Sequence, residues 1–230
     1  MDSPVAAVLF DLDGTLMDHE TASVRAVLEC WPDADPAFLA RRWGELTDEY
    51  VERFAAGEMS FTEQRRCRAV LLADELGHPG WDEARADAWF ADYLVRYQGY
   101  WAAYPDVLPA FEELAARGLR FGIVTNGDGA QQRAKLERIG VLPRVADCVI
   151  ASREVGAAKP DAAIFAAACG RLGLPPGAVL HVGDLLDTDA RGATAAGLTG
   201  VWLDRPGTGS AADVPRIGTL AELPGLLGPG

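Results

Sequence analysis

Positive charge is scarce in this 230-residue chain. Lysine and arginine together number 21 against 34 aspartates and glutamates, which leaves a formal net charge of −13 and a pI near 4.6. Lysine is the rarest basic residue and occurs only at Lys135 and Lys159. An acidic surface repels nucleic acids and anionic membranes, so we expect neither as a partner.

Paired cysteines and long apolar runs are also missing. The four cysteines (Cys30, Cys67, Cys148 and Cys169) are far apart and form no C-x-x-C pair. This spacing argues against a disulfide framework or a zinc site and favours buried thiols in a reducing compartment. No apolar stretch approaches the roughly 20 residues of a membrane span, and the start of the chain lacks a basic signal segment. We therefore expect a cytoplasmic protein, whose 49% hydrophobic residues suffice for a sizeable core.

The chain begins with a short apolar run that ends on two aspartates. Residues 5–10 are typical of a buried strand in a parallel sheet, and Asp11 and Asp13 follow at once. Because side chains alternate along a strand, both carboxylates can leave on the same side, and Gly14 then allows a sharp turn. Two carboxylates about 4 Å apart repel by roughly 4 kcal/mol at an effective dielectric of about 20. The pair therefore indicates a bound cation, a shared proton or a nearby lysine.

Residues 17–104 change to a helical pattern. Asp35–Pro36 predicts an N-cap followed by a first-turn proline, and Ser60–Glu63 predicts a capping box. Apolar residues then recur at helical spacing from Trp81 to Tyr100. Five of the six tryptophans lie in this segment, at positions 31, 43, 81, 89 and 101. We predict a small inserted helical domain with an aromatic core, the alternative for these side chains being a substrate-recognition surface.

Strands and helices alternate from residue 105 onward. Further strands are expected at residues 119–125, 148–151, 178–182 and 200–203, with at most one more near Ile217. Helices are expected at residues 109–117, 131–139, 161–172 and 190–196. This alternation predicts an α/β fold with a doubly wound, Rossmann-like parallel sheet. Residues 1–16 and 105–230 would form this core, and residues 17–104 the inserted domain.

Polar residues stand where the predicted strands end. They are Asp11, Asp13, Thr125, Asn126 and Asp184. Because doubly wound sheets bind ligands at the carboxyl ends of their strands, we expect these side chains on one rim. Their oxygen atoms suit Mg²⁺, which commonly takes one or two carboxylates and keeps its waters for a phosphate.

Several charged residues near this rim admit two interpretations. Asp187 and Asp189 could bind a metal or could cap the first turn of a helix, and capping is the better interpretation of Asp187. Lys159 precedes a helix start, where its ammonium and exposed amides could hold a phosphate, although a lone lysine is more often solvated. Lys135 is interpreted as a surface residue and His181 as a core residue.

Four segments resemble, in order and spacing, the four motifs of the haloacid dehalogenase superfamily. They are Asp11-Leu-Asp13-Gly-Thr-Leu, Val124-Thr125-Asn-Gly, Lys159-Pro-Asp and Gly183-Asp184-x-x-x-x-Asp189. Each motif is weak alone, whereas the ordered set is specific and covers essentially the whole chain. The inserted helical domain resembles the C1 cap of that family.

The resemblance implies phosphoryl transfer through an aspartyl-phosphate intermediate. Asp11 would be the nucleophile, and Asp13 would protonate the leaving oxygen and then activate water. Lys159 would neutralise Asp11 and the charge that develops on the phosphoryl group.

The resemblance also implies which residues bind phosphate and metal. Thr125, with the amides of Asn126 and Gly127, would bind phosphate oxygens. Mg²⁺ would be held by Asp11, the Asp13 carbonyl and Asp184, with Asp189 helping directly or through water.

Two features separate the branches of the family. Dehalogenases carry no carboxylate at the position of Asp13, which therefore favours a phosphatase. Phosphonate-cleaving relatives form a Schiff base with a cap lysine, and residues 17–104 contain none.

The region from Thr125 to Leu136 is similar to the corresponding region of nucleotidases and N-acylneuraminate phosphatases. The expected partner is a small phosphorylated metabolite of nucleotide, sugar phosphate or phosphoglycolate type, hydrolysed by a monomer or homodimer.

The sequence is compatible with two alternative functions. A sugar phosphomutase keeps the same core motifs, so the motifs alone do not reject it. A regulatory protein that binds phosphate without catalysis would keep the fold, although Asp13 would then have no use. A signalling receiver domain is disfavoured by the order of the acidic residues and by the inserted helices.

Overall fold

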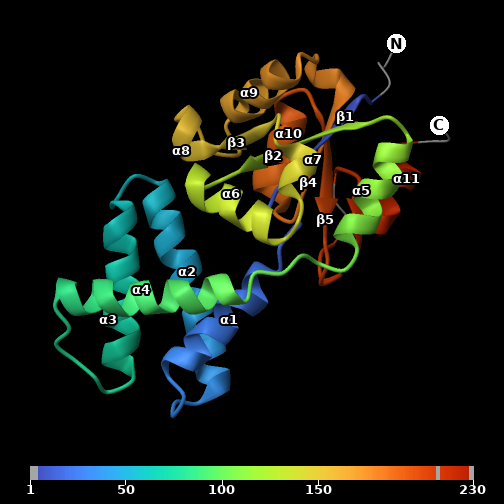
Figure 1. The fold of residues 1–230 in the computed structure, drawn as a ribbon. Coiled ribbons are helices and arrows are strands. Elements are labelled where there is room, and N and C mark those ends of the chain that lie inside the picture. The colour runs from blue at the N-terminus through green and yellow to red at the C-terminus, as the bar shows by residue number, and fades with distance from the viewer. Residues whose placement is uncertain (1–4, 211–212, 228–230) are drawn as a thin grey trace. The chain divides into compact units, whose positions relative to one another are not determined.

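A computed structural model describes residues 5–210 and 213–227, which form two compact units (Figure 1). One unit combines the described residues up to Asp18 with those from Ala102 onward, and the other is residues 19–101. The inserted unit thus starts at residue 19 and ends at residue 101, against the expected 17 and 104. None of the described helices combines the length and the apolar character that a membrane crossing requires.

The larger unit contains a six-stranded sheet in which all paired strands are parallel. The strand order is β3-β2-β1-β4-β5-β6. The strands are β1 (Ala7–Phe10), β2 (Arg120–Thr125), β3 (Val149–Ala151), β4 (Val179–Gly183), β5 (Thr199–Leu203) and β6 (Arg216–Ile217). This topology confirms the doubly wound α/β fold. The strand order reverses between β1 and β4, and ligands bind at such a switch point in open α/β sheets.

The register of the central strands aligns the residues that follow them. Phe10 is opposite Ile123 on β2 and Val182 on β4. Asp11 continues the ladder, because its N–H donates to the carbonyl of Val182 at 3.0 Å. The chain therefore leaves β1, β2 and β4 at nearly the same level of the sheet, and their end residues share one rim.

Successive side chains of β1 point into two different layers of the core, one on each face of the sheet. Leu9 is fully buried in a cluster with Ile164 and Phe165 of α9 (Ala162–Leu172). Phe10 points the other way and stacks on Phe111 of α5 (Val107–Ala116), with ring centroids 4.7 Å apart. Both faces of β1 are therefore covered by helices, which explains why its sequence is uniformly apolar rather than alternating.

The remaining elements of the larger unit are short. The helices are α6 (Gly129–Arg138), α7 (Leu142–Val145), α8 (Ser152–Val155), α10 (Gly192–Ala195) and α11 (Leu223–Leu226). Two 3₁₀ turns, η1 (Pro176–Ala178) and η3 (Leu220–Glu222), and a π-helical turn, η2 (Leu186–Arg191), complete the unit. The sequence predicts an α-helix over 190–196, but the chain enters the π turn earlier and α10 keeps only four residues. Single π turns are rare and occur mostly at functional sites.

The inserted unit consists of four helices. They are α1 (His19–Cys30), α2 (Pro36–Ala55), α3 (Phe61–Glu75) and α4 (Glu83–Gly99). Asp35 caps α2 by accepting from Phe38 N at 2.6 Å, and Ser60 forms the expected capping box with Glu63. These local signals mark the helix starts in the sequence because the side chains satisfy otherwise unpaired N–H groups.

Aromatic side chains fill the centre of the inserted unit. Trp43 is 1% exposed, and its Nε1–H donates to Ser23 Oγ and Tyr93 Oη, both at 3.1 Å. Trp101 is also buried, whereas the other three tryptophans of the unit are half-buried. A buried aromatic side chain such as Trp43, whose N–H is satisfied, stabilises a helical bundle of this size.

Candidate active site

Asp11 lies at the end of β1 and is almost fully buried. Its side chain is 9% exposed, and its Oδ1 accepts a hydrogen bond from Lys159 Nζ at 2.5 Å. Burial raises the pKa of Asp11, and the negative charges of Asp189 and Asp184 add to this effect, whereas the Lys159 ammonium opposes it. Without a further cation, the single positive charge of Lys159 does not neutralise the negative charges of Asp11 and its two acidic neighbours.

Asp184 follows β4 and is held beside the turn after β1. Its backbone N–H donates to Thr15 Oγ1 at 3.1 Å, and that hydroxyl donates in turn to Asp184 Oδ1 at 3.3 Å. Gly14 has φ +84°, and a Cβ there would overlap the Asp184 carboxylate. Glycine is therefore required both by the backbone and by the approach of the carboxylate.

Asp189 lies on the π turn η2 and is 1% exposed. Its Oδ1 is 2.7 Å from Lys159 Nζ and 3.2 Å from His181 Nε2, and its Oδ2 accepts from Leu185 N at 3.1 Å. Although burial disfavours the carboxylate, Lys159 and His181 hold the pKa of Asp189 below its usual range. Burial keeps the pKa of His181 below its usual range, so its neutral ring donates from Nε2. His181 is buried as predicted, and it also orients Asp189.

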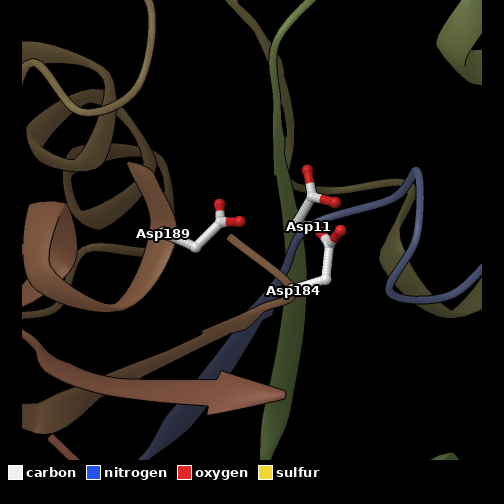
Figure 2. Close-up of side chains that lie close together, drawn as sticks. All are labelled: Asp11, Asp184 and Asp189. Carbon is white, nitrogen blue, oxygen red and sulfur yellow. The ribbon is translucent and has the colours of Figure 1, made fainter. Parts of the chain in front are cut away.

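These three carboxylates form one cluster. One oxygen atom from each of Asp11, Asp184 and Asp189 lies within 4.8 Å of the others, and Figure 2 shows the three side chains gathered beyond the strand ends. The cluster carries three potential negative charges against the single ammonium of Lys159. Buried carboxylate oxygens with uncompensated charge are the donor set that Mg²⁺ prefers, so the residues present fit this ion.

The pKa of Asp184 reflects the excess of negative charge in the cluster. Burial, reinforced by the charge of Asp189, raises the pKa of Asp184 to about 6. An aspartate in an unfolded chain has a pKa of about 3.9. The folded state therefore binds more protons than the unfolded state between these values, and the metal-free protein loses stability as the pH rises through them.

Lys159 is positioned through its own backbone. The Asn126 side chain accepts from Lys159 N at 2.8 Å and donates to Lys159 O at 3.1 Å, so it clamps the residue from both sides. The ammonium bridges Asp11 and Asp189 and is 2% exposed. The side chain of Asn126 thus orients the lysine, while its backbone amide was the group expected to bind phosphate.

Asp13 faces away from the carboxylate cluster and toward α6. Lys135 Nζ lies 2.8 Å from both of its oxygens, and Gln132 Nε2 donates to its Oδ2 at 2.9 Å. The expectation that Lys135 is a surface residue is wrong, because it is 5% exposed. Burial of a lysine is stable here because Asp13 compensates its charge. The Asp13 carboxylate does not belong to the metal cluster of the described residues, which leaves the carbonyl as its expected metal ligand.

The expected phosphate-binding residues lie at the end of β2. Thr125 is 1% exposed, and its Oγ1 accepts from Gln132 Nε2 at 2.7 Å. The N–H of Gly127 donates to Ser152 Oγ at 2.9 Å. A phosphate oxygen would have to share or replace that contact. Gln132 lies in the stretch that is similar to nucleotidases and N-acylneuraminate phosphatases, but neither it nor Ser152 had an expected role in the site, because neither lies in one of the four motifs.

Asp187 points out of the site. Its side chain is 80% exposed and pairs with Arg191 one helical turn later at 2.7 Å. We expect Asp187→Asn to leave kcat/KM within about twofold of wild type, because exposed pairs of this kind contribute little. Phosphate release under saturating Mg²⁺ measures this, and a loss of tenfold or more, on the order of 1.4 kcal/mol, would place Asp187 in the reaction after all.

Comparison with known proteins relates the whole chain to one group of hydrolases. A family model described as haloacid dehalogenase-like hydrolase matches residues 5–197. Glyceraldehyde 3-phosphate phosphatase of Methanopyrus kandleri is 32% identical over 210 residues, which cover 87% of this chain and 84% of that protein. N-acylneuraminate-9-phosphatase of Homo sapiens is 30% identical over 243 residues, which cover 98% of this chain and 94% of that protein. The crystal structure of the HAD-hydrolase YfnB from Bacillus subtilis covers 98% of this chain and 100% of its own, with a TM-score of 0.81; at 22% identity it shows the shared fold.

Proposed function

Since this chain belongs to the haloacid dehalogenase-like hydrolases and is a phosphatase of that family, we propose that it hydrolyses small phosphate monoesters through an aspartyl-phosphate on Asp11. One observation carries the proposal. Asp11 and Asp13 stand two residues apart, yet each has its own lysine: Lys159 lies 2.5 Å from Asp11, and Lys135 lies 2.8 Å from Asp13. Two carboxylates in separate environments can take the two different roles that phosphoryl transfer requires.

The first step transfers the phosphoryl group to the enzyme. A carboxylate oxygen of Asp11 attacks phosphorus while the bond to the leaving oxygen breaks. Asp13, in its protonated form, gives its proton to that oxygen, so an alcohol departs and Asp13 becomes a carboxylate. Lys159 stabilises the charge on the equatorial phosphoryl oxygens.

The second step regenerates the enzyme. A water molecule attacks the phosphorus of the aspartyl-phosphate and gives one proton to the Asp13 carboxylate. The bond between phosphorus and the Asp11 oxygen breaks, so inorganic phosphate and the Asp11 carboxylate form. Asp13 is protonated again and the cycle is closed.

Asp11 and Asp184 would hold Mg²⁺, with the Asp13 carbonyl and Asp189 as further ligands. Such an ion, when bound, neutralises phosphate oxygens and orients the ester for attack. Lys159 and His181 keep Asp189 ionised and oriented toward the cluster, and the Thr15 hydroxyl orients Asp184. These contacts fix the orientation of the carboxylates that would hold the ion.

The proposed substrates are small metabolites with a phosphate monoester. The two relatives described above are phosphatases named for glyceraldehyde 3-phosphate and for N-acylneuraminate 9-phosphate, which favours small phosphorylated metabolites over larger substrates. A sugar phosphomutase of the same fold is the second candidate, because it shares the first chemical step. The two differ in the second step, where the acceptor is water for a phosphatase and a sugar hydroxyl for a mutase.

A substrate panel with Mg²⁺ tests the proposal. Nucleoside monophosphates, sugar phosphates, phosphoglycolate and N-acylneuraminate 9-phosphate would be compared by kcat/KM for phosphate release. We expect release from at least one ester and none after chelation of the metal. Isomerised sugar phosphate without net phosphate release would favour the mutase, and inactivity on every ester would favour a non-catalytic phosphate-binding protein.

Mg²⁺ is expected to stabilise the protein, and more so at neutral than at acidic pH. Above about pH 6 the Asp184 carboxyl is ionised, so the metal replaces repulsion with attraction, whereas at lower pH it must displace a proton. We predict that saturating Mg²⁺ raises Tm by several degrees at about pH 7.5 and by clearly less at about pH 5. Differential scanning fluorimetry measures both shifts. In Asp184→Asn the shift should largely disappear, and an equal shift in this variant would show that the ion binds elsewhere.

A further inference from the structure

Lys135 and Gln132 are two buried polar residues to which the two reaction steps above assign no role. They lie three positions apart on α6 and therefore project from the same face of the helix. Gln132 is 3% exposed and Lys135 is 5% exposed. Ordering and burying two long polar side chains costs free energy, which only their contacts can offset.

Those contacts converge on Asp13. Lys135 Nζ lies 2.8 Å from each carboxylate oxygen, and Gln132 Nε2 donates to Oδ2 at 2.9 Å. The N-terminus of α6 is itself capped, because Asp128 Oδ1 accepts from Ala130 N and Gln131 N, both at 3.1 Å. A helix anchored in this way presents two donors in fixed positions to one carboxylate.

Gln132 also connects Asp13 to Thr125. The same Nε2 donates to Thr125 Oγ1 at 2.7 Å, which uses both hydrogens of the amide. Because Thr125 Oγ1 accepts this bond, the hydrogen of its own hydroxyl is directed elsewhere and can donate to a phosphate oxygen. One glutamine therefore orients both the proposed acid and the proposed phosphate ligand.

We propose that Lys135 and Gln132 are positioning residues that aim Asp13 at the leaving oxygen of the ester. Lys135 also stabilises the negative charge that appears on Asp13 as its proton moves to that oxygen. This assignment rests on the proposed function, because it needs Asp13 to act as the acid. Each of the two lysines of the chain thus contacts one of the two aspartates that follow β1.

A positioning role of Lys135 makes its contribution to kcat/KM depend on the leaving group of the substrate, whereas a purely structural role does not. Protonation by Asp13 matters most when the leaving group is a strongly basic alkoxide and little when it is the weakly basic 4-nitrophenolate. The parameter kcat/KM reports the first step, in which the leaving group departs. Loss of Lys135 should therefore lower kcat/KM selectively for alkyl phosphates.

The test compares Lys135→Met with wild type on two substrates, 4-nitrophenyl phosphate and the best alkyl phosphate of the panel. We expect a loss of about 10- to 100-fold on the alkyl ester and less than about fivefold on the nitrophenyl ester. Lys135→Arg should recover part of the loss on the alkyl ester, because it retains a cation near Asp13. Arg138→Met removes one positive charge from an exposed position of the same helix and should leave both values within about twofold.

Equal losses of Lys135→Met on both substrates, or no loss on either, would overturn the inference. Should this variant not fold, Lys135→Gln provides the same test, because it removes the cation that contacts Asp13 and keeps a polar side chain at this buried position. An inactive wild type would overturn the proposed function itself. An active wild type with an unselective Lys135→Met overturns only the positioning role.

Discussion

Asp11→Asn is expected to lower kcat by about 10⁴-fold or more, the largest effect of any single substitution in the chain. The amide has nearly the shape of the carboxylate but does not attack phosphorus, so the first covalent bond cannot form. Lys159, 2.5 Å from Asp11 Oδ1, would keep its contact with Asp189 and remain in place. Phosphate release with saturating Mg²⁺ measures kcat for both proteins.

Unfolding is not expected to explain this loss. Burial raises the pKa of Asp11, which means that the folded protein disfavours its charge, and asparagine removes that charge. The Tm of the metal-free variant should therefore equal or exceed that of wild type.

A control and a direct assay for the intermediate make the result specific. Asp187→Asn is the same chemical change at an exposed position, and it should retain activity. Acid-quenched wild type should carry one phosphoryl group on the peptide that contains Asp11, and the Asp11→Asn variant none. Turnover of Asp11→Asn within about tenfold of wild type would rule out an aspartyl-phosphate on this residue.

Lys159→Met is expected to impair both catalysis and stability. The ammonium bridges Asp11 and Asp189, and the three side chains are between 1% and 9% exposed. Its removal leaves two buried carboxylates without their cation, which costs on the order of 3–5 kcal/mol of stability. Because the same charge would face the phosphoryl group in the proposed reaction, kcat should also fall by about 10²- to 10³-fold.

The pH dependence separates these effects from a general packing defect. Although burial alone would raise it, Lys159 holds the pKa of Asp189 below its usual range. A depressed carboxyl pKa contributes stability at neutral pH that is lost on acidification toward that pKa. The difference in unfolding free energy between wild type and Lys159→Met should therefore shrink as the pH falls, which urea denaturation at several pH values measures.

Two comparisons control for the size and charge of the substituted side chain. Lys159→Arg keeps the charge and should be more stable than Lys159→Met. Mg²⁺ should stabilise Lys159→Met more than wild type, because the ion meets more uncompensated negative charge. A stability loss that is independent of both pH and Mg²⁺ would contradict the electrostatic role.

Local patterns in the sequence predicted much of the architecture. The apolar run before Asp11 and the alternation of strands and helices after residue 105 predicted a parallel sheet with polar residues at its strand ends. Helix starts at Asp35 and Ser60 were also predictable, because capping is an interaction between residues three positions apart. Element ends shifted by a few residues, and the π turn around Asp189 was missed because no local signal distinguishes it from an α-helix.

The sequence by itself determined the family, the sheet and the list of acidic residues at its rim, since these follow from short-range periodicity and from the order of four motifs. Only the tertiary structure decided which partner each acid has. Lys135 and Asp13 are 122 positions apart, and Lys159 and Asp11 are 148 apart. Periodicity shows that a lysine lies on a helix, but whether its charge is solvated or buried against a carboxylate depends on what packs opposite. That is a property of the folded chain, which brings distant segments within hydrogen-bonding distance.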